Sequence, residues 1–193
     1  MNNRDGNAGE LLSESVVRRA CAGEPQAFEA LCLHFEKPLF GYLYGMLRNA
    51  HSAQDAVQET LLRVFRMTRE GRLNWQPALA RSLVFSIAHN IAVDELRRAR
   101  VRPLPEREPA EPINPAEQAL AREQIDQALA RLPESHRSAL MLRVWGELTY
   151  AEISDTLGAT QAEVKIWLYR ARKRLAELLD RDGQYIGPNT KSV

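Results

Sequence analysis

Two helix-capping patterns on either side of one glycine constrain this chain more than any other feature of its sequence. Thr149 is followed three residues later by Glu152, and Thr160 by Glu163. A Thr-x-x-Glu spacing of this kind is typical of a capping box at a helix N-terminus. Gly158 lies between the two boxes, and glycine tolerates the positive φ that a tight turn between helices needs. The region therefore predicts two capped helices in a helix-turn-helix, an arrangement typical of DNA-binding proteins.

Basic residues are concentrated in two short runs. The whole chain is nearly neutral, with 26 basic and 25 acidic residues and a formal net charge of +1. Residues 164–175 nevertheless contain five basic side chains and no acidic one, and residues 96–105 contain four and no acidic one. A local excess of positive charge indicates a polyanionic partner more strongly than the overall charge does.

The proline distribution divides the chain into two helical parts. Five of the ten prolines lie within residues 103–115, where they remove backbone donors and disfavour helix. Both flanking parts show helical spacing of apolar residues and no sustained alternation. We therefore expect an all-α fold with two small helical domains joined by a Pro-rich linker, the C-terminal domain containing the helix-turn-helix. The expected ranges are 10–100 and 117–180 for the domains, 101–116 for the linker and 181–193 for a disordered tail.

The composition excludes several classes of protein. No apolar run is long enough to span a membrane, and the N-terminal residues lack the apolar core of a signal peptide. Cys21 and Cys32 alone make no disulfide framework, so we expect a cytoplasmic protein. Cys32 and His34 would not share a helix face, and no phosphate-binding glycine loop or nucleophile elbow is present. We therefore expect no metal, no cofactor and no catalytic site, so the chain should not be an enzyme.

The helix expected over residues 51–67 has two different faces. An apolar stripe through Val57, Leu61, Val64, Phe65 and Thr68 predicts the side that packs into the core. The opposite side is polar and acidic around one leucine. Its members are Asp55, Gln58, Glu59, Leu62 and Arg66. Composition leaves two readings open for this side, a solvated helix face or a docking surface for another protein.

The helix expected over residues 80–100 is apolar nearly all round, which predicts a central helix packed on several sides. Its polar positions form a stripe, made of Ser86, Asn90 and Arg97 with Asp94 and Arg98 beside them. An amide such as that of Asn90 needs a partner when it is buried, because an unpaired one costs about 1–3 kcal/mol. The partner is either within the chain or a nucleic acid, and Asp94 either contacts DNA itself or orients an arginine.

Three segments carry a resemblance to a known family. They are AQDAVQETLLRVF at 53–65, SIAHNIAVDELRRAR at 86–100 and ALARLPESHRSALMLRVWGELTYAEISDTLGATQAEVKIWLYRARKRL at 128–175. In this order and spacing they resemble the extracytoplasmic-function (ECF) group of RNA polymerase sigma factors, in the sigma-70 family. The resemblance implies a region 2 domain that docks on core polymerase and recognises and melts the promoter −10 element. It also implies a region 4 domain that recognises the −35 element.

The resemblance assigns candidate contacts in three sets. The polymerase-binding set is Asp55, Gln58, Glu59 and Leu62. The −10 set is Asn90, Asp94, Arg97 and Arg98, together with Trp75 in the preceding loop. Trp75 would either hold a flipped base by stacking or anchor the core. The −35 set is Thr160, Gln161, Lys165, Ile166, Tyr169, Arg170, Arg172 and Lys173.

The chain departs from the family pattern at a few of these positions. Many members have Ser-Arg where this chain has Ile166 and Trp167. Ile166 removes a potential bidentate contact to guanine but suits the methyl group of thymine. Trp167 lies near the edge of the expected core, which favours packing over base contact. Leu83 and His89 stand where Trp and Arg are common.

The sequence therefore predicts a sigma factor that confers promoter-specific transcription initiation on bacterial RNA polymerase. Its expected partners are core RNA polymerase, promoter DNA and an anti-sigma factor that covers the polymerase-binding surfaces. The alternative is a self-sufficient helix-turn-helix regulator that binds an operator without acting as a polymerase subunit. A pure protein-interaction module is a further alternative. The first of these would not require the acidic face, and the second would not require the basic run.

Overall fold

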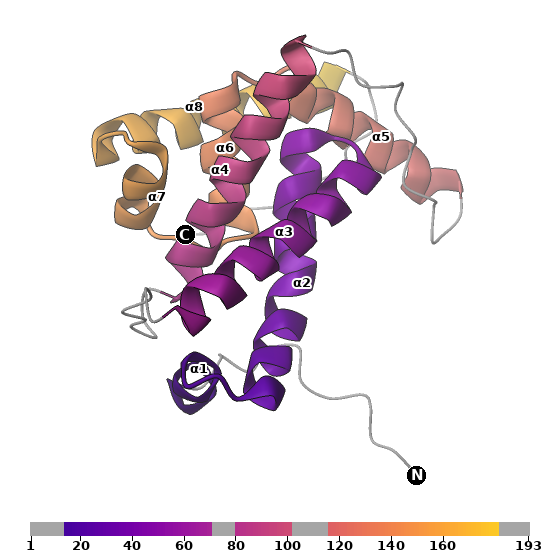
Figure 1. Cartoon of the computed structure of the whole chain (residues 1–193). Helices are drawn as coiled ribbons and strands as arrows, with labels where there is room; N and C mark the ends of the chain where they lie inside the picture. Colours follow the sequence, from indigo (N-terminus) through magenta and orange to yellow (C-terminus); the bar gives the residue numbers. More distant parts are fainter. Residues whose placement is uncertain (1–13, 71–79, 102–115, 182–193) are drawn as a thin grey trace.

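The computed structural model describes residues 14–70, 80–101 and 116–181, which form helices without any strand. The first half contains α1 (Glu14–Cys21), α2 (Pro25–Leu47), α3 (Ala50–Arg69) and α4 (Ala80–Val101), and the second contains α5 (Ala116–Ala130), α6 (Glu134–Val144), α7 (Tyr150–Leu157) and α8 (Gln161–Arg181). The expected all-α fold is confirmed (Figure 1). None of these described helices is both long and apolar enough to cross a membrane.

Local signals set the ends of α1 and α2. Gly23 adopts a φ of +84° between them, a left-handed conformation that glycine tolerates. Pro25 begins α2, where its missing N–H group is no loss. The helix continues through Pro38 and ends at Leu47, and the next residue, Arg48, adopts a left-handed conformation with a φ of 57°. Along its length α2 buries one apolar side, made of Leu31, Phe35, Leu39, Tyr42 and Met46.

The apolar stripe predicted on α3 faces the core with one exception. Val57 and Val64 are buried as expected. Phe65 remains 36% exposed because it lies at the edge of the stripe. Its ring packs against that of Phe28, with 4.9 Å between the ring centroids. Thr60 is fully buried, and its hydroxyl donates to a backbone carbonyl one turn earlier at 2.7 Å. A polar residue is tolerated there because its hydrogen bond is satisfied within the helix.

α4 is the central helix of the first half. Val84, Phe85, Ala88 and Ala92 are completely buried, and the helix packs against α2, α3 and α7. Ser86 of the polar stripe is half-buried, with its hydroxyl 3.0 Å from that of Thr156 on α7, whereas Asn90, one turn further along, is exposed. The expected packing of this helix on several sides is confirmed, and Asn90, which remains exposed, needs no buried partner within the chain. An all-round apolar pattern does not say which side remains uncovered.

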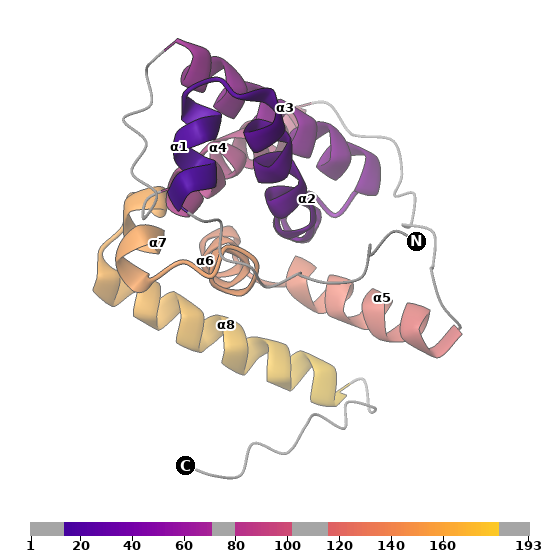
Figure 2. The same cartoon turned by 90° about the horizontal axis from the view of Figure 1, so that it is seen from below.

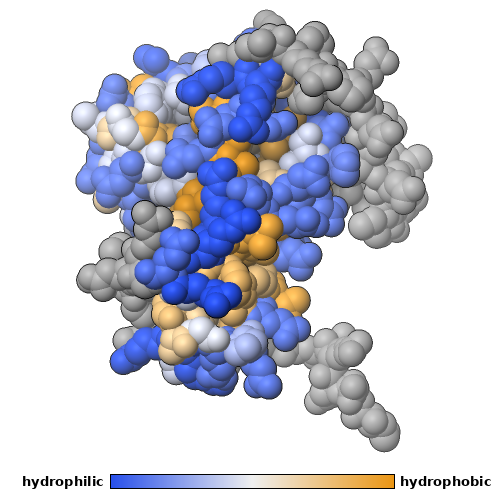
Figure 3. Space-filling model, viewed as in Figure 1, coloured by the Kyte–Doolittle hydropathy of each residue, from blue (hydrophilic) through white to orange (hydrophobic). Residues whose placement is uncertain are grey.

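The two halves of the chain share one hydrophobic core. α2 packs against α6, and α4 packs against α7. The buried side chains of both halves form a single cluster, so α6 and α7 lie directly against the first half (Figures 1 and 2). The sequence predicted two domains but no contact between them, and the domain and linker boundaries remain predictions. Hydrophilic side chains cover much of the face seen in Figure 3, with apolar patches between them.

Candidate protein-docking and nucleic-acid interfaces

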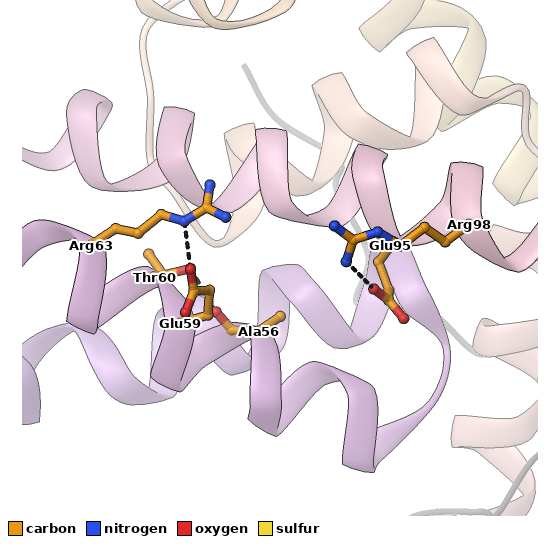
Figure 4. A network of polar contacts seen from close by, with 6 residues as sticks. All are labelled: Ala56, Glu59, Thr60, Arg63, Glu95 and Arg98. Carbon is orange, nitrogen blue, oxygen red and sulfur yellow. Dashed lines mark hydrogen bonds and ion pairs between the residues drawn. The ribbon is translucent and has the colours of Figure 1, made fainter.

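The acidic side of α3 is a solvent-facing surface. Asp55, Gln58 and Leu62 are exposed, and Leu62 has 48% of its surface accessible. Glu59 is half-buried and accepts a hydrogen bond from Arg63 Nε at 2.7 Å, which neutralises part of the acidic face (Figure 4). The surface therefore combines an apolar side chain with polar groups that can still form hydrogen bonds. This combination suits a protein partner more than a solvated face alone.

The polar stripe of α4 presents its basic side chains to solvent. Asn90, Asp94, Arg97 and Arg98 are all exposed. Arg97 lies 3.8 Å from Asp94. Arg98 lies 3.5 Å from Glu95, as Figure 4 shows. Ion pairs of this length on an exposed helix contribute little, so both guanidinium groups remain able to bind phosphate. Trp75, the other member of the −10 set, lies outside the described residues.

The helix-turn-helix forms as the capping patterns predicted. Thr149 and Glu152 complete a capping box at the start of α7. The same reciprocal bonds form at α8, where the backbone N–H of Thr160 donates to Glu163 at 2.8 Å and the N–H of Glu163 donates to the Thr160 hydroxyl at 3.2 Å. Gly158 adopts a φ of 63° between the helices. These bonds from Thr160 lower the pKa of the Glu163 carboxyl group, which keeps the cap ionised.

α8 separates a packing face from an exposed face as its periodicity predicted. Val164, Leu168, Ala171 and Leu178 are buried in the core, with Leu175 packed beside them. The exposed face carries two large apolar side chains among polar ones, with Ile166 46% and Tyr169 62% exposed. The remaining −35 candidates are exposed too: Thr160, Gln161, Lys165, Arg170, Arg172 and Lys173. The exposed face of α8 is therefore accessible to a partner along the first turns of the helix.

The basic end of α8 is partly tied to its own helix. Arg172 Nε donates to the carbonyl oxygen of Leu168 at 3.2 Å, and Arg174 pairs with Glu177 at 3.2 Å. Lys173 is exposed between them. Because flexible, exposed basic groups at the end of a recognition helix meet the DNA backbone, this end suits phosphate contacts more than base reading.

Two residues that depart from the family pattern, Trp167 and His89, pack against other side chains. Trp167 is half-buried and lies against the core, which favours the packing interpretation of its side chain. His89 is partly buried and shares a hydrogen bond of 2.9 Å between its Nδ1 atom and the Tyr42 hydroxyl. Burial lowers the pKa of His89 and raises that of Tyr42, so both groups are neutral near pH 7.

The two thiols have no reactive environment. Cys21 and Cys32 are free and half-buried, and each lies in the first half of the chain. Burial raises the pKa of both thiols, and the carboxylates of Glu36 and Glu29 add to the effect at Cys32. A raised pKa disfavours the thiolate, which is the nucleophile and the metal ligand. The raised pKa values therefore disfavour a nucleophilic or metal-binding role for both thiols.

Sequence reasoning missed the residues that join the two halves. Arg81 of α4 donates to the carbonyl oxygen of Gly146 at 2.6 Å, and Tyr44 of α2 donates to Asp126 of α5 at 2.7 Å. One local signal was present in the sequence. Gly41 and Gly45 lie one turn apart on α2, and a pair of glycines on one helix face marks a place where another element approaches closely.

The chain is similar to known proteins over both halves. The family models "Sigma-70 region 2" and "Sigma-70, region 4" match residues 31–102 and 122–175. ECF RNA polymerase sigma factor SigE of Mycolicibacterium smegmatis is 32% identical over 167 residues, which are 82% of this chain and 63% of SigE. This chain therefore spans less than two thirds of the length of that relative. ECF RNA polymerase sigma factor SigL of Mycobacterium tuberculosis is 31% identical over 176 residues, 86% of this chain and 97% of SigL.

The fold is also that of a solved structure. CnrH, solved in complex with the cytosolic domain of CnrY, superimposes with a TM-score of 0.70 at 20% identity, over 89% of this chain and 99% of CnrH. An identity of this size supports the fold alone. The family membership follows from the two matched regions and from the similarity to SigL along nearly its full length. This chain therefore belongs to the ECF RNA polymerase sigma factors of the sigma-70 family.

Proposed function

We propose that this chain is a dissociable initiation subunit that gives bacterial RNA polymerase its promoter specificity. One observation carries the proposal. The acidic face of α3, the polar stripe of α4 and the reading face of α8 are all solvent-exposed on one chain. A sigma factor needs these three surfaces together, because it must hold polymerase while it contacts two separate DNA elements. Sigma factors are not enzymes, and we propose no catalytic residue and no cofactor.

Core polymerase binds the α3 face in this proposal. Asp55, Gln58 and Glu59 provide the polar contacts, and Leu62 provides an apolar anchor at the centre of the surface. An exposed leucine among polar side chains is the usual composition of an interface centre with a polar rim.

The −10 element binds the polar stripe of α4 as a single strand. Arg97 and Arg98 hold phosphates, while Asn90 offers an amide to an unpaired base and Asp94 orients Arg97 or contacts a base itself. Trp75 is proposed to stack on a flipped base or to anchor the core.

The −35 element binds α8 as a duplex. Gln161, Lys165, Ile166 and Tyr169 are the proposed readers, because they lie on the N-terminal part of the exposed face. Thr160, Arg170, Arg172 and Lys173 are proposed to contact the DNA backbone. Ile166 in place of a hydrogen-bonding side chain favours a thymine methyl group at the base that it meets.

The proposed domains are residues 10–100 for region 2 and 117–180 for region 4, with residues 101–116 as a linker. We propose that the chain acts in the cytoplasm, where polymerase and chromosome are found. An anti-sigma factor that covers the polymerase-binding surface is the proposed regulator. CnrH, which shares this fold, was itself solved in complex with a second protein, the cytosolic domain of CnrY.

Run-off transcription tests the proposal. Purified core polymerase is assayed with and without this chain on a library of promoter sequences. Initiation from a defined subset of promoters only when the chain is present is the expected result. Specific binding of the free chain to a DNA site, with no promoter-specific initiation, would contradict the proposal and support an independent DNA-binding regulator.

A further inference from the structure

The middle of the exposed face of α8 is apolar. Ala162, Ile166 and Tyr169 are all exposed, with 46% of Ile166 and 62% of Tyr169 accessible. At 3.6 residues per turn these three positions fall within about 60° of one another, on the side of the helix opposite the buried Val164 and Leu168. We call the three residues the α8 stripe. Neighbouring exposed apolar side chains on one helix face indicate contact with a partner.

Basic side chains border the α8 stripe on both sides. Lys165 and Arg172 are exposed on one flank, and Arg170 and Arg174 are exposed on the other. Glu163, which lies beside them, accepts hydrogen bonds from the N-cap of its own helix at 2.8 and 2.7 Å, so its carboxylate belongs to the capping box. Cationic groups on both flanks complement the two phosphate backbones that border a groove of DNA. The charge pattern therefore favours DNA as the partner of the stripe.

The α8 stripe has little ability to form hydrogen bonds with bases. Ala162 and Ile166 have no polar side-chain atom, and Tyr169 has only its hydroxyl group. In the major groove, base pairs differ in their hydrogen-bonding groups and in one apolar group, the C5 methyl of thymine. Ile166, at the centre of the exposed face, can sense only this apolar group. It therefore responds to the presence of a methyl group and not to the rest of the base.

We propose that the α8 stripe recognises the C5 methyl group of a pyrimidine in the −35 element, in thymine and in 5-methylcytosine alike. The two bases carry this methyl at the same ring position and differ at C4, where thymine has an oxygen acceptor and cytosine an amino donor. Ile166 forms no hydrogen bond with either group and so does not distinguish them. Methylation of a cytosine that faces Ile166 therefore strengthens the −35 element. The inference rests on the proposed function, because it takes α8 as the helix that binds the −35 duplex.

The length of the stripe limits the number of methyl groups that it contacts. Ala162 and Tyr169 are seven residues apart, which is about 10 Å along the helix axis. Base pairs are about 3.4 Å apart along the duplex, so the stripe covers roughly three of them. A helix about 10–12 Å wide fits a major groove about 12 Å wide. We therefore expect one to three neighbouring positions at which binding depends on a methyl group.

Removal of single methyl groups from DNA tests the proposal. The full-length chain, with and without core polymerase, selects its preferred duplex from a random library. Each thymine of that duplex is then replaced by deoxyuridine, which lacks only the methyl group. The dissociation constant should rise about three- to fivefold at one to three neighbouring positions and stay unchanged elsewhere. When cytosine replaces thymine at such a position, methylation of that cytosine should tighten binding by a similar factor.

Variants of the chain connect the effect to the stripe. Ile166→Ala should bring the ratio of thymine to deoxyuridine affinity close to one at its position, whereas Ile166→Leu keeps an apolar side chain of the same size and should retain the ratio. Ile125→Ala is the matched control, because Ile125 is exposed to a similar extent, 40%, on α5. Lys173→Ala should weaken binding to every duplex and leave the ratio unchanged, because its proposed contact is a phosphate.

Four results would overturn the proposal. They are equal affinity for thymine and deoxyuridine at every position, an unchanged ratio with Ile166→Ala, no gain from methylation of cytosine, and no enriched duplex. Run-off transcription decides the proposed function separately. Promoter-specific initiation with equal affinity for thymine and deoxyuridine would refute the methyl contact alone. Methyl-dependent binding without promoter-specific initiation would refute the sigma function alone.

Discussion

At the scale of single residues, Ile166 distinguishes the proposed base-reading face of α8 from one that uses an arginine. Its side chain is 46% exposed, and Lys165 beside it is exposed as well, whereas the neighbouring Val164 is buried. An apolar side chain at this place reads a methyl group by contact and offers no hydrogen bond. Lys173 lies two turns further along, where a helix end meets phosphates.

Substitutions along α8 should therefore have two different effects on −35 binding. Ile166→Ala or Lys165→Ala should alter base preference at one or two positions, by about 1–3 kcal/mol per base pair. Lys173→Ala should weaken binding to all sequences alike and reduce the slope of log K against log salt by about 0.9. Fluorescence anisotropy with a duplex library at several salt concentrations measures both. An equal loss on every duplex for Ile166→Ala would contradict the reader assignment.

His89 should make the folded chain sensitive to acid. Burial lowers its pKa in the folded state, so below the pKa of the unfolded chain, near 6.5, the unfolded state binds a proton that the folded state does not. Stability should be fully present above that pKa and should decrease as the pH falls below it. Urea unfolding at several pH values between about 7 and 5 measures the effect.

The variant His89→Gln isolates this contribution, because glutamine accepts the hydrogen bond of Tyr42 without titrating. We expect it to flatten the decrease in the free energy of unfolding below pH 6.5. An unchanged pH dependence would show that other groups cause it. His34 and His136, whose pKa values burial also lowers, are the next to replace.

At the scale of elements, α3 has one side that packs in the core and an opposite side that we propose binds a partner. Its buried side needs apolar residues at helical spacing, and the exposed side is free to carry Asp55, Gln58 and Leu62. Changes on the exposed side should therefore affect binding without affecting the fold.

The double variant Gln58→Ala, Leu62→Ala should weaken core polymerase binding by about tenfold or more, since truncation of a central apolar anchor commonly costs at least 1–2 kcal/mol. The thermal midpoint should remain close to that of the unmodified chain. Surface plasmon resonance on immobilised core enzyme measures the affinity. His51→Ala, at an exposed position near the start of the same helix, is the control. Equal affinities of the double variant and the control would remove α3 from the proposed interface.

The caps of the helix-turn-helix can be tested at the same scale. Thr160→Ala removes the hydroxyl that accepts from the Glu163 N–H, and the free energy of unfolding should fall by about 0.5–2 kcal/mol. Thr160→Ser keeps that hydroxyl and should restore most of the loss. Chemical denaturation followed by circular dichroism measures both variants, and equal stability of the two would mean that the cap is not needed.

At the scale of the whole molecule, the shared core makes the two halves depend on each other. Trp145 of the second half packs on α2 of the first, and the buried side chains of both form one cluster. A continuous core predicts cooperative unfolding, because neither half retains its buried surface when the other unfolds.

Hydrogen exchange measured at increasing urea concentrations should therefore show that the amides of α2 and α6 in the free chain lose protection at the same urea midpoint. In the Gly41→Ala variant the two midpoints should separate, since the added methyl group collides with Trp145 and the contact is lost while the first half keeps its helix. Two well-separated midpoints in the unmodified chain would mean that the halves unfold as independent domains.

Much of the fold could be predicted because the ends of helices are determined by residues close together in the sequence. The boxes at Thr149 and Thr160 and the glycine between them act through residues three or four positions apart, and each forms as expected. The buried stripe of α8 follows from the same short spacing. The partial exposure of Phe65 was missed, and the surroundings of Asn90 were left open, because periodicity identifies an apolar side but not the neighbour that covers it.

The helices, the helix-turn-helix and the family can all be recognised from the amino-acid sequence, since each depends on patterns within short segments. The contact between the two halves cannot, because Gly41 and Trp145 are about a hundred positions apart and nothing local links them. The folded arrangement also decides which part of α4 remains exposed, since its sequence is apolar nearly all round. Close packing depends on the matched shapes of distant surfaces, and such complementarity exists only once the chain is folded.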